Sequence, residues 1–305
     1  MMPSPPAPPP ASRKKTLPAP RIYVITATNA DVAVVFARTS GWFHIARWDL
    51  LTGSVTAGAW LRGGLYPRRC DISPDGEFLY YFGMKGGRAF HAISRMPWLT
   101  ALALWRASGT YSNGGHFVKV PRRALKPTDE FLQQPPTIGD SAPLLEQHRL
   151  RMVGNATTAY KAERRRGWLE HETCPPREAN DVWDERRAQI LFHQHPTRKL
   201  RLILTDAGIT HALGNIEGRK PSYSIDDKIT TTLLPDAVWA DWDRQGRLLV
   251  ATANGALEIR GVATAASAAS VADNAVELRF NNVTSSSLAG IRPDPTPSPL
   301  IAQRW

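Results

Sequence analysis

The sequence predicts an all-β protein, and two features of its residue pattern support this fold class. Short runs of Val, Ile, Tyr, Phe and Trp recur along the chain, with Gly, Asn, Asp or Pro between them, as in strands joined by tight turns. Apolar residues at helical spacing are not sustained beyond about ten residues, except around residues 159–169. With 42% hydrophobic residues, the chain can also bury a sizeable core. We therefore expect mostly antiparallel β-structure.

The clearest strands of this pattern are flanked by turn residues. Thr39-Ser40-Gly41 separates two apolar runs, and Lys85-Gly86-Gly87 separates another two, as expected for hairpins. The predicted strands, in chain order, are residues 22–26, 32–36, 42–48, 78–82, 90–93, 190–192, 200–204 and 248–251.

Proline divides the chain into a body and two arms. Residues 1–20 hold eight of the 25 prolines, a composition that favours an extended, disordered arm. Residues 284–305 carry four more at alternate positions and predict a flexible tail. The body, residues 21–283, is expected to be a single domain. Within it, residues 119–147 contain five prolines and little β-pattern, so we interpret them as an irregular insertion.

Several classes of protein are excluded by composition. The longest nearly continuous apolar stretch, residues 98–105, is too short to cross a bilayer as a helix. The N-terminal segment lacks the order of a secretory signal, and Cys70 and Cys174 cannot build a disulfide framework. We expect a soluble cytoplasmic protein without a cofactor and without membrane contact.

The chain is basic, with a formal net charge of +11. The excess lies in the first two thirds, because residues 202–305 carry nine basic and eleven acidic side chains. One interpretation is attraction to nucleic acid or another polyanion, for which Arg164, Arg165 and Arg166 are the binding candidates. The other is an arginine-rich composition spread over solvated faces. The second is favoured, because no aromatic-rich motif surrounds the arginine run.

A weak internal repeat links two distant stretches. Residues 70–80, CDISPDGEFLY, align with residues 240–250, ADWDRQGRLLV. The two stretches share, in the same order, a small residue, aspartate, an apolar residue, a polar turn, glycine and an apolar strand. The two stretches begin 170 residues apart (240 minus 70), and about four propeller blades of roughly 42 residues span that distance. Glycine supplies the positive φ of such a turn, and Asp or Ser binds the turn backbone.

These residues resemble the WD-repeat and related bacterial β-propeller families. Residues 45–53, IARWDLLTG, are similar to the end of a third blade strand, its Trp-Asp dipeptide and the turn into the fourth strand. Ser73-Pro74-Asp75-Gly76 is similar to the turn between the first and second strands of the next blade. The Gly-His pair that opens many WD repeats is missing. Trp183-Asp184 and Trp242-Asp243 precede the expected second strand and are not repeat signatures.

The resemblance implies a β-propeller-like fold of about five four-stranded blades. The alternation Val276, Leu278, Phe280 is the expected final strand, which would close the ring against the N-terminal one. A two-sheet β-sandwich is the alternative fold.

The sequence contains no convincing catalytic set. His193 and His195 lie at positions i and i+2 of a predicted strand end, where both imidazoles would share a face and a metal ion. His171 and Cys174 are conceivable further ligands, but a polar strand end explains the pair equally well. Four aspartates (Asp71, Asp75, Asp241 and Asp243) lie in the repeat turns, where capping the turn backbone is a simpler role than acid–base catalysis. We expect no catalytic residues and no bound metal.

The expected function is that of a non-catalytic protein-interaction module, whose loops bind an unidentified protein or peptide. The alternative is a hydrolase or lyase on the same scaffold, with a metal or polar site in the central channel. Nucleic acid or another polyanion is the third possible partner.

Overall fold

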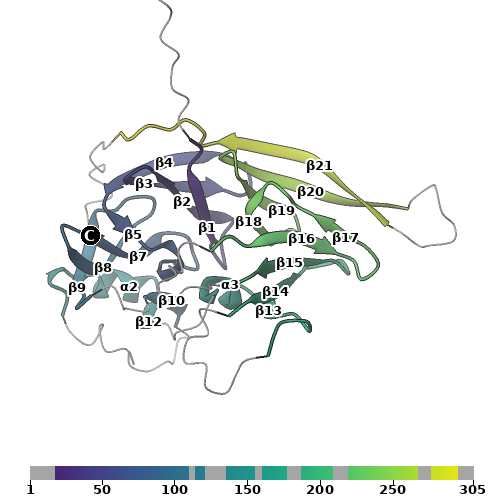
Figure 1. Cartoon of the computed structure of the whole chain (residues 1–305). Helices are drawn as coiled ribbons and strands as arrows, with labels where there is room; N and C mark the ends of the chain where they lie inside the picture. Colours follow the sequence, from purple (N-terminus) through teal and green to yellow (C-terminus); the bar gives the residue numbers. More distant parts are fainter. Residues whose placement is uncertain are drawn as a thin grey trace, which may run out of the picture.

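The computed structural model describes residues 18–109, 114–120, 135–154, 160–176, 187–208, 219–266 and 276–294. In these residues the chain forms antiparallel strands with two short α-helices and one turn of 3-10 helix, Pro67–Arg69 (Figure 1). The predicted all-β class is confirmed. The predicted strands also coincide with observed ones, apart from a one-residue offset at Leu200.

The first sheet is a four-stranded meander. Its inner strands are buried on both faces, which explains their nearly continuous apolar sequence. Trp48 is fully buried at the end of the third strand, and Asp49 Oδ1 accepts a hydrogen bond from the Thr52 amide at 2.8 Å. The Trp-Asp dipeptide and the turn after it therefore lie where the sequence predicted. The strands are β1 (Arg21–Thr26), β2 (Val32–Thr39), β3 (Trp42–Asp49) and β4 (Val55–Arg62).

The second sheet is larger, and the third is small. The second sheet contains β5 (Gly64–Leu65), β6 (Asp71–Ile72), β7 (Phe78–Lys85), β8 (Arg88–Arg95), β9 (Ala101–Arg106) and β11 (Ile138–Gly139). The third pairs β10 (Gly115–Lys119) with β12 (Leu150–Gly154), preceded by helix α2 (Ala142–Gln147).

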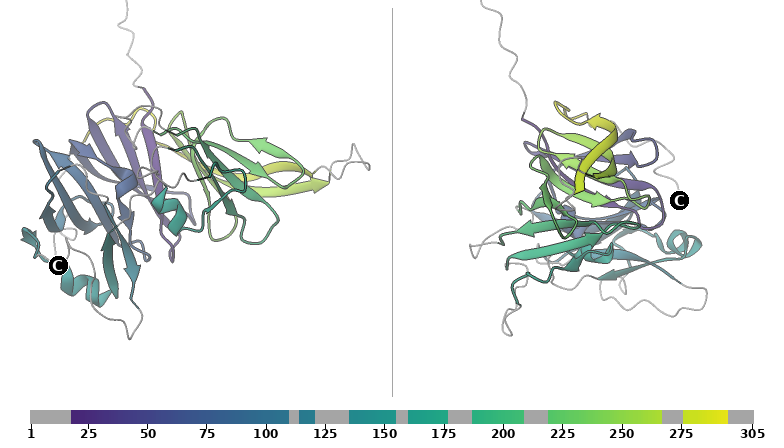
Figure 2. Two further views of the ribbon diagram at one scale, coloured as in Figure 1. Left: turned by 60° about the horizontal axis from the view of Figure 1, so that its bottom comes forward. Right: turned by 90° about the vertical axis from the view of Figure 1, so that its right-hand side faces the viewer.

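The fourth and fifth sheets follow the third in chain order. The fourth contains β13 (Leu169–Glu170), β14 (Gln189–Gln194), β15 (Arg201–Asp206), β16 (Ser222–Asp226) and β17 (Thr231–Leu233). The fifth contains β18 (Ala237–Trp242), β19 (Leu248–Thr252), β20 (Ala256–Ala266) and β21 (Val276–Ser287). The far ends of β20 and β21 project away from the other sheets (Figure 2).

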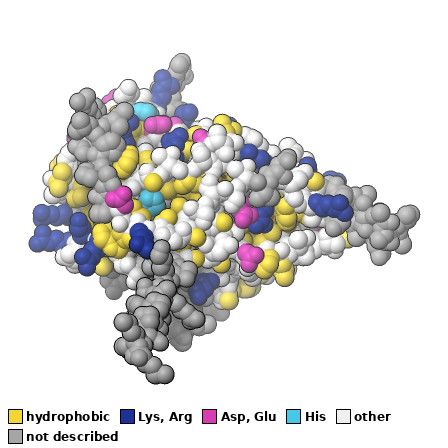
Figure 3. All heavy atoms as spheres, turned by 90° about the horizontal axis from the view of Figure 1, so that it is seen from above, with side chains coloured by type: hydrophobic (Ala, Val, Ile, Leu, Met, Phe, Trp, Pro, Cys, Tyr) yellow, Lys and Arg dark blue, Asp and Glu magenta, His cyan; other side chains and the backbone are white. Residues whose placement is uncertain are grey.

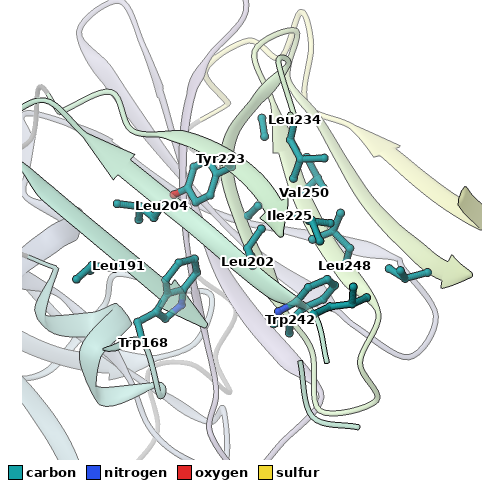
Figure 4. Packing of buried hydrophobic residues seen from close by; sticks show 14 of the residues in the cluster. Trp168, Leu191, Leu202, Leu204, Tyr223, Ile225, Leu234, Trp242, Leu248 and Val250 are labelled. Carbon is teal, nitrogen blue, oxygen red and sulfur yellow. The ribbon is translucent and has the colours of Figure 1, made fainter. Parts of the chain in front are cut away.

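Hydrophobic clusters join the sheets to their neighbours. One cluster lies between the first and second sheets, another between the second and third, and a third between the fifth and first. The cluster between the fourth and fifth sheets includes Trp168 and Trp242 (Figure 4). Helix α3 (Lys161–Arg165) lies below β1 and between β10 and β14 in Figure 1, and its Glu163 accepts a hydrogen bond from Tyr23 of β1 at 3.0 Å. Residues 160–168, here called the α3 segment, pack Ala162 into the first of these clusters and Trp168 into the last.

Several details differ from the sequence-based expectations. The described residues form five separate sheets rather than the two of a sandwich, and the third sheet has two strands rather than four. The described part of the predicted insertion, residues 119–120 and 135–147, contains β11, which pairs with β9, and α2.

The C-terminal expectations also need correction. The last strand, β21, pairs with β20 and not with the N-terminal strand β1. Strand β21 continues to Ser287, and Leu288 is buried, so ordered structure runs past residue 284, where the sequence predicted the tail to begin. The hydroxyl of Ser286 donates to the Gly53 carbonyl at 2.9 Å, which ties this end to the β3–β4 turn. Residues 1–17 and 295–305 lie outside the described residues.

Candidate functional site

Two corners of the structure have nearly the same geometry. The turn between β6 and β7 places Gly76 at φ 77°, and the turn between β18 and β19 places Gly246 at φ 76°. Each glycine amide donates three residues back, to the Ser73 carbonyl at 2.9 Å and to the Asp243 carbonyl at 3.1 Å. The Ser73 hydroxyl accepts from the Phe78 amide, and Asp243 Oδ1 accepts from the Arg247 amide. The aligned stretches are therefore equivalent strand–turn–strand corners.

The four repeat aspartates divide into two kinds. Asp75 and Asp243 bind turn amides, as predicted. Asp71 and Asp241 precede the turns and are buried in the interior, with 3% and 4% of their surface exposed. Burial of a carboxylate is strongly unfavourable unless it is paired, so we expect each of these two side chains to have a hydrogen-bond or ionic partner.

Both buried aspartates are bound by the α3 segment. Arg166 Nη2 lies 2.8 Å from Asp71 Oδ1, and its Nε donates to the Thr26 carbonyl of β1 at 2.6 Å. Two residues later, Trp168 Nε1 donates to Asp241 Oδ1 at 3.1 Å. The α3 segment therefore links the first, second and fifth sheets through hydrogen bonds that are largely excluded from water.

His193 and His195 are held by different partners. His193 Nδ1 lies 2.6 Å from Asp241 Oδ1. Burial acts to lower the pKa of His193, but the adjacent Asp241 carboxylate outweighs this effect, and the pKa is raised. His195 lies past the end of β14; its Nε2 is 2.9 Å from the Gly246 carbonyl, and its Nδ1 accepts from two backbone amides.

These contacts do not form the metal site for which His193 and His195 were candidates in the sequence. Both ring nitrogens of His195 are in hydrogen bonds to the backbone, so neither is directed to a site shared with His193. His171 contacts Thr173 and Glu172 instead. Among the residues with described positions, no group of three or more His, Cys, Asp or Glu side chains is arranged to hold a metal ion.

The arginine run is bound to the chain's own acceptors. Arg164 pairs with Glu170 at 3.0 Å and donates to Gln189 at 2.9 Å. Burial lowers the pKa of Arg165. Arg166 is almost fully buried against Asp71. Arg164 and Arg166 therefore bind the chain's own acceptors, and all three residues are partly buried. On the face in Figure 3, the Lys and Arg side chains lie in separate groups, without a continuous patch.

A second set of buried polar groups lies around Tyr160, at the start of the α3 segment. Its hydroxyl donates to Asp206 Oδ2 at 2.8 Å, and Asp206 also pairs with Arg219. Arg68 and Arg219 lie 4.8 and 5.5 Å from the centre of the Tyr160 ring. Burial is the main cause of the raised pKa of Tyr160, which therefore keeps its proton and donates to Asp206 at neutral pH.

A pocket of about 410 Å³ adjoins this set. Its walls come from four sheets or their flanking loops, including Tyr23 of β1, Arg68 after β5, Arg219 before β16 and Val238 of β18. We call it the basic pocket, because its lining includes Arg21, Arg38, Arg68, Arg219 and Lys220 and no Asp or Glu.

Sequence reasoning did not find the basic pocket. Its residues are separated by up to 234 positions (253 minus 19), and they meet only because several sheets converge. No local spacing marks Arg68 or Arg219, which look like ordinary basic residues near proline.

Comparisons with known proteins do not assign a family. No family model and no curated protein matches the sequence. Among solved structures, hydrazine synthase of Kuenenia stuttgartiensis is 11% identical, with 82% of this chain and 79% of that chain covered and a TM-score of 0.31. The β-propeller domain of Myceliophteria thermophila Cps50 (Swd1) is 12% identical, with 88% and 76% covered and a TM-score of 0.23. In the described parts of the chain, no helix has the length and apolar character needed to span a bilayer.

Proposed function

We propose that the five sheets are the blades of a propeller-like ring of the WD-repeat type, with the α3 segment at its centre. Three observations support this architecture. Hydrophobic clusters join the first sheet to the second, the second to the third, the fourth to the fifth, and the fifth back to the first. The corners at Asp71 and Asp241 are equivalent, and both are directed toward the same segment. The Trp-Asp dipeptide ends the third strand of the first sheet, as it does in WD repeats.

We further propose that this ring is a non-catalytic module that binds a protein or peptide partner in the cytoplasm. The observation that carries this proposal is the exposed apolar edge of the fourth sheet. Strand β17 is at the end of that sheet, and Leu233 on it is 71% exposed. Ile229, in the loop that leads into β17, is 62% exposed.

The physical argument concerns both backbone and side chains. A strand at the end of a sheet has backbone groups available for pairing with an added strand, and exposed apolar side chains favour association. A peptide that adds a strand beside β17 would gain backbone hydrogen bonds and cover these two side chains.

The test compares a surface double variant with a matched control. Ile229→Asp with Leu233→Asp introduces charge at the proposed edge, whereas Leu51→Asp changes a residue of similar exposure (58%) in the β3–β4 turn. We expect wild type and Leu51→Asp to retain one stoichiometric partner from native lysate and the double variant to lose it. Absence of such a partner at every ionic strength, or equal retention by all three proteins, would contradict the proposal.

The second candidate is a hydrolase or lyase with its polar site in the centre of the ring. The His193–Asp241 pair favours it, because a carboxylate that orients an imidazole is a common feature of general-base catalysis. Hydrolysis of an ester panel by wild type, but not by His193→Gln, would support this candidate. Metal analysis of both proteins would show whether a divalent ion is involved.

A further inference from the structure

The basic pocket has the size and construction of a small-molecule site. Its volume of about 410 Å³ lies within the range of pockets that enclose small ligands, roughly 300–1,000 Å³. Because four sheets or their flanking loops supply its walls, most of the lining is placed by rigid strands and their ends.

The charge of the lining is strongly one-sided. Five basic side chains and no acidic ones line the pocket. The acids that partly compensate them lie behind the wall. Glu163 is 3.6 Å from Arg68, and Asp206 pairs with Arg219. Arg38 and Lys220 are exposed at the pocket and add to its positive potential. A concave site lined by one sign of charge concentrates ligands of the opposite sign.

Arg219 is the most informative of these residues. Its side chain is 1% exposed, and one of its terminal nitrogens is bound to Asp206. Its Nε and its Nη2 are buried without a hydrogen-bond acceptor in the described part of the chain. Buried guanidinium groups normally use these donors, because an unsatisfied one is costly. Because both atoms have almost no accessible surface, Arg219 contributes positive charge behind the pocket wall, and the exposed Arg38 and Lys220 are the side chains that can contact a ligand oxygen.

The remaining lining is apolar. Phe36, Phe43, Leu65 and Pro67 lie in the wall, and the Arg38 guanidinium is 5.4 Å from the centre of the Phe43 ring. An apolar body can therefore pack in the pocket while its charged group is directed to the arginines.

We infer that the basic pocket binds a small organic oxyanion, a carboxylate or phosphate attached to an apolar body. This site is separate from the exposed edge at β17 and does not depend on a protein partner. Removal of the ligand's charge is expected to weaken binding more than removal of an equal charge from a distant surface of the protein.

The test uses titration calorimetry of the full chain with four probes. They are 1-naphthyl phosphate, 1-naphthoate, 1-naphthol and inorganic phosphate. The principal variant is Arg38→Gln with Lys220→Gln, because both residues are exposed and their loss leaves no buried acid unpaired. Arg62→Gln with Arg88→Gln, at two exposed positions outside the pocket lining, is the control with the same change in net charge.

We expect saturable binding of at least one naphthyl anion by wild type and by the control. The double variant should bind that anion about tenfold more weakly, and the difference should shrink as salt is added. Tighter binding of the phosphate than the carboxylate, or the reverse, identifies the oxyanion. Equal binding of 1-naphthol, equal weakening by both variants, or no saturable binding at millimolar concentration would overturn the inference.

Discussion

Arg166 donates to Asp71 across a separation of 95 residues, with Nη2 and Oδ1 2.8 Å apart and both side chains almost fully buried. This ion pair joins the α3 segment to the second sheet. Trp168, two residues further on, joins the same segment to the fifth sheet through Asp241. The α3 segment is thus held by directional polar contacts as well as by apolar packing, which fix it relative to the first, second and fifth sheets.

Alanine substitutions at the two corner glycines should be comparably destabilising. A Cβ at Gly76 would lie 2.3 Å from Val32 Cγ1, and a Cβ at Gly246 would lie 2.5 Å from His195 Cε1. Both positions also require positive φ. We expect Gly76→Ala and Gly246→Ala each to lower the free energy of unfolding by about 2–3 kcal/mol, measured by urea denaturation.

Gly41→Ala is the matched control for this pair. Its φ of 78° is nearly the same, but an added Cβ would meet no atom within 4 Å. It should cost only the backbone strain, about 1 kcal/mol. Equal losses of unfolding free energy in all three variants would mean that the corners are not closely packed against neighbouring strands.

The free energy of unfolding should decrease at acidic pH because two buried histidines are neutral in the folded protein. Burial lowers the pKa of His44 and of His91 to about 4, whereas the ordinary value is 6.5. Below pH 6.5 the unfolded chain binds protons that the folded chain does not, so stability decreases as pH falls toward 4. Each group contributes at most about 1.4 kcal/mol per pH unit.

His91→Gln tests this expectation directly. The His91 ring shares a hydrogen bond with the Tyr80 hydroxyl, with 2.6 Å between Nδ1 and Oη, and a glutamine amide can donate or accept without titrating. The free energy of unfolding of the variant should depend less steeply on pH in this range. An unchanged slope would show that His91 is protonated in the folded protein.

His193 should produce the opposite trend at higher pH. Although burial opposes it, the Asp241 carboxylate raises the pKa of His193 above 6.5. The charged pair therefore contributes its full stability below pH 6.5 and loses it as the pH rises through the raised pKa. His193→Gln should lack this falling limb in urea denaturation series from about pH 6 to about pH 9. A wild-type protein with no such limb would mean that His193 and Asp241 are not in contact.

The sequence predicted the corners well because their determinants are local. The turn between Ser73 and Gly76 requires a glycine at positive φ and a side-chain acceptor nearby, and both appear as a readable pattern. The inward direction of Asp71 and Asp241 was not predicted. Nothing in their neighbourhoods reveals that Arg166 and Trp168 approach them from a distant part of the chain.

The basic pocket and strand β11 were missed for related reasons. Arg68 and Arg219 acquire their role only from the convergence of several sheets, which depends on the whole fold. Strand β11 lies in a proline-rich region that favoured a loop, yet it pairs with β9 of the second sheet. Tertiary pairing outweighs local propensity in such short strands.

The position of the α3 segment is tested most directly by a double-mutant cycle between Asp71→Asn and Arg166→Gln, measured as free energies of unfolding. Each single variant leaves a buried charge unpaired and should destabilise by about 3 kcal/mol. The double variant should be less destabilised than the sum of the two, with a coupling energy of at least about 1.5 kcal/mol. Arg166→Gln combined with Asp227→Asn, in the loop before β17, should be additive because, among the described residues, Asp227 binds only members of its own loop. Additivity of the Asp71 and Arg166 substitutions within about 0.5 kcal/mol would place the α3 segment away from the centre and contradict the proposed arrangement.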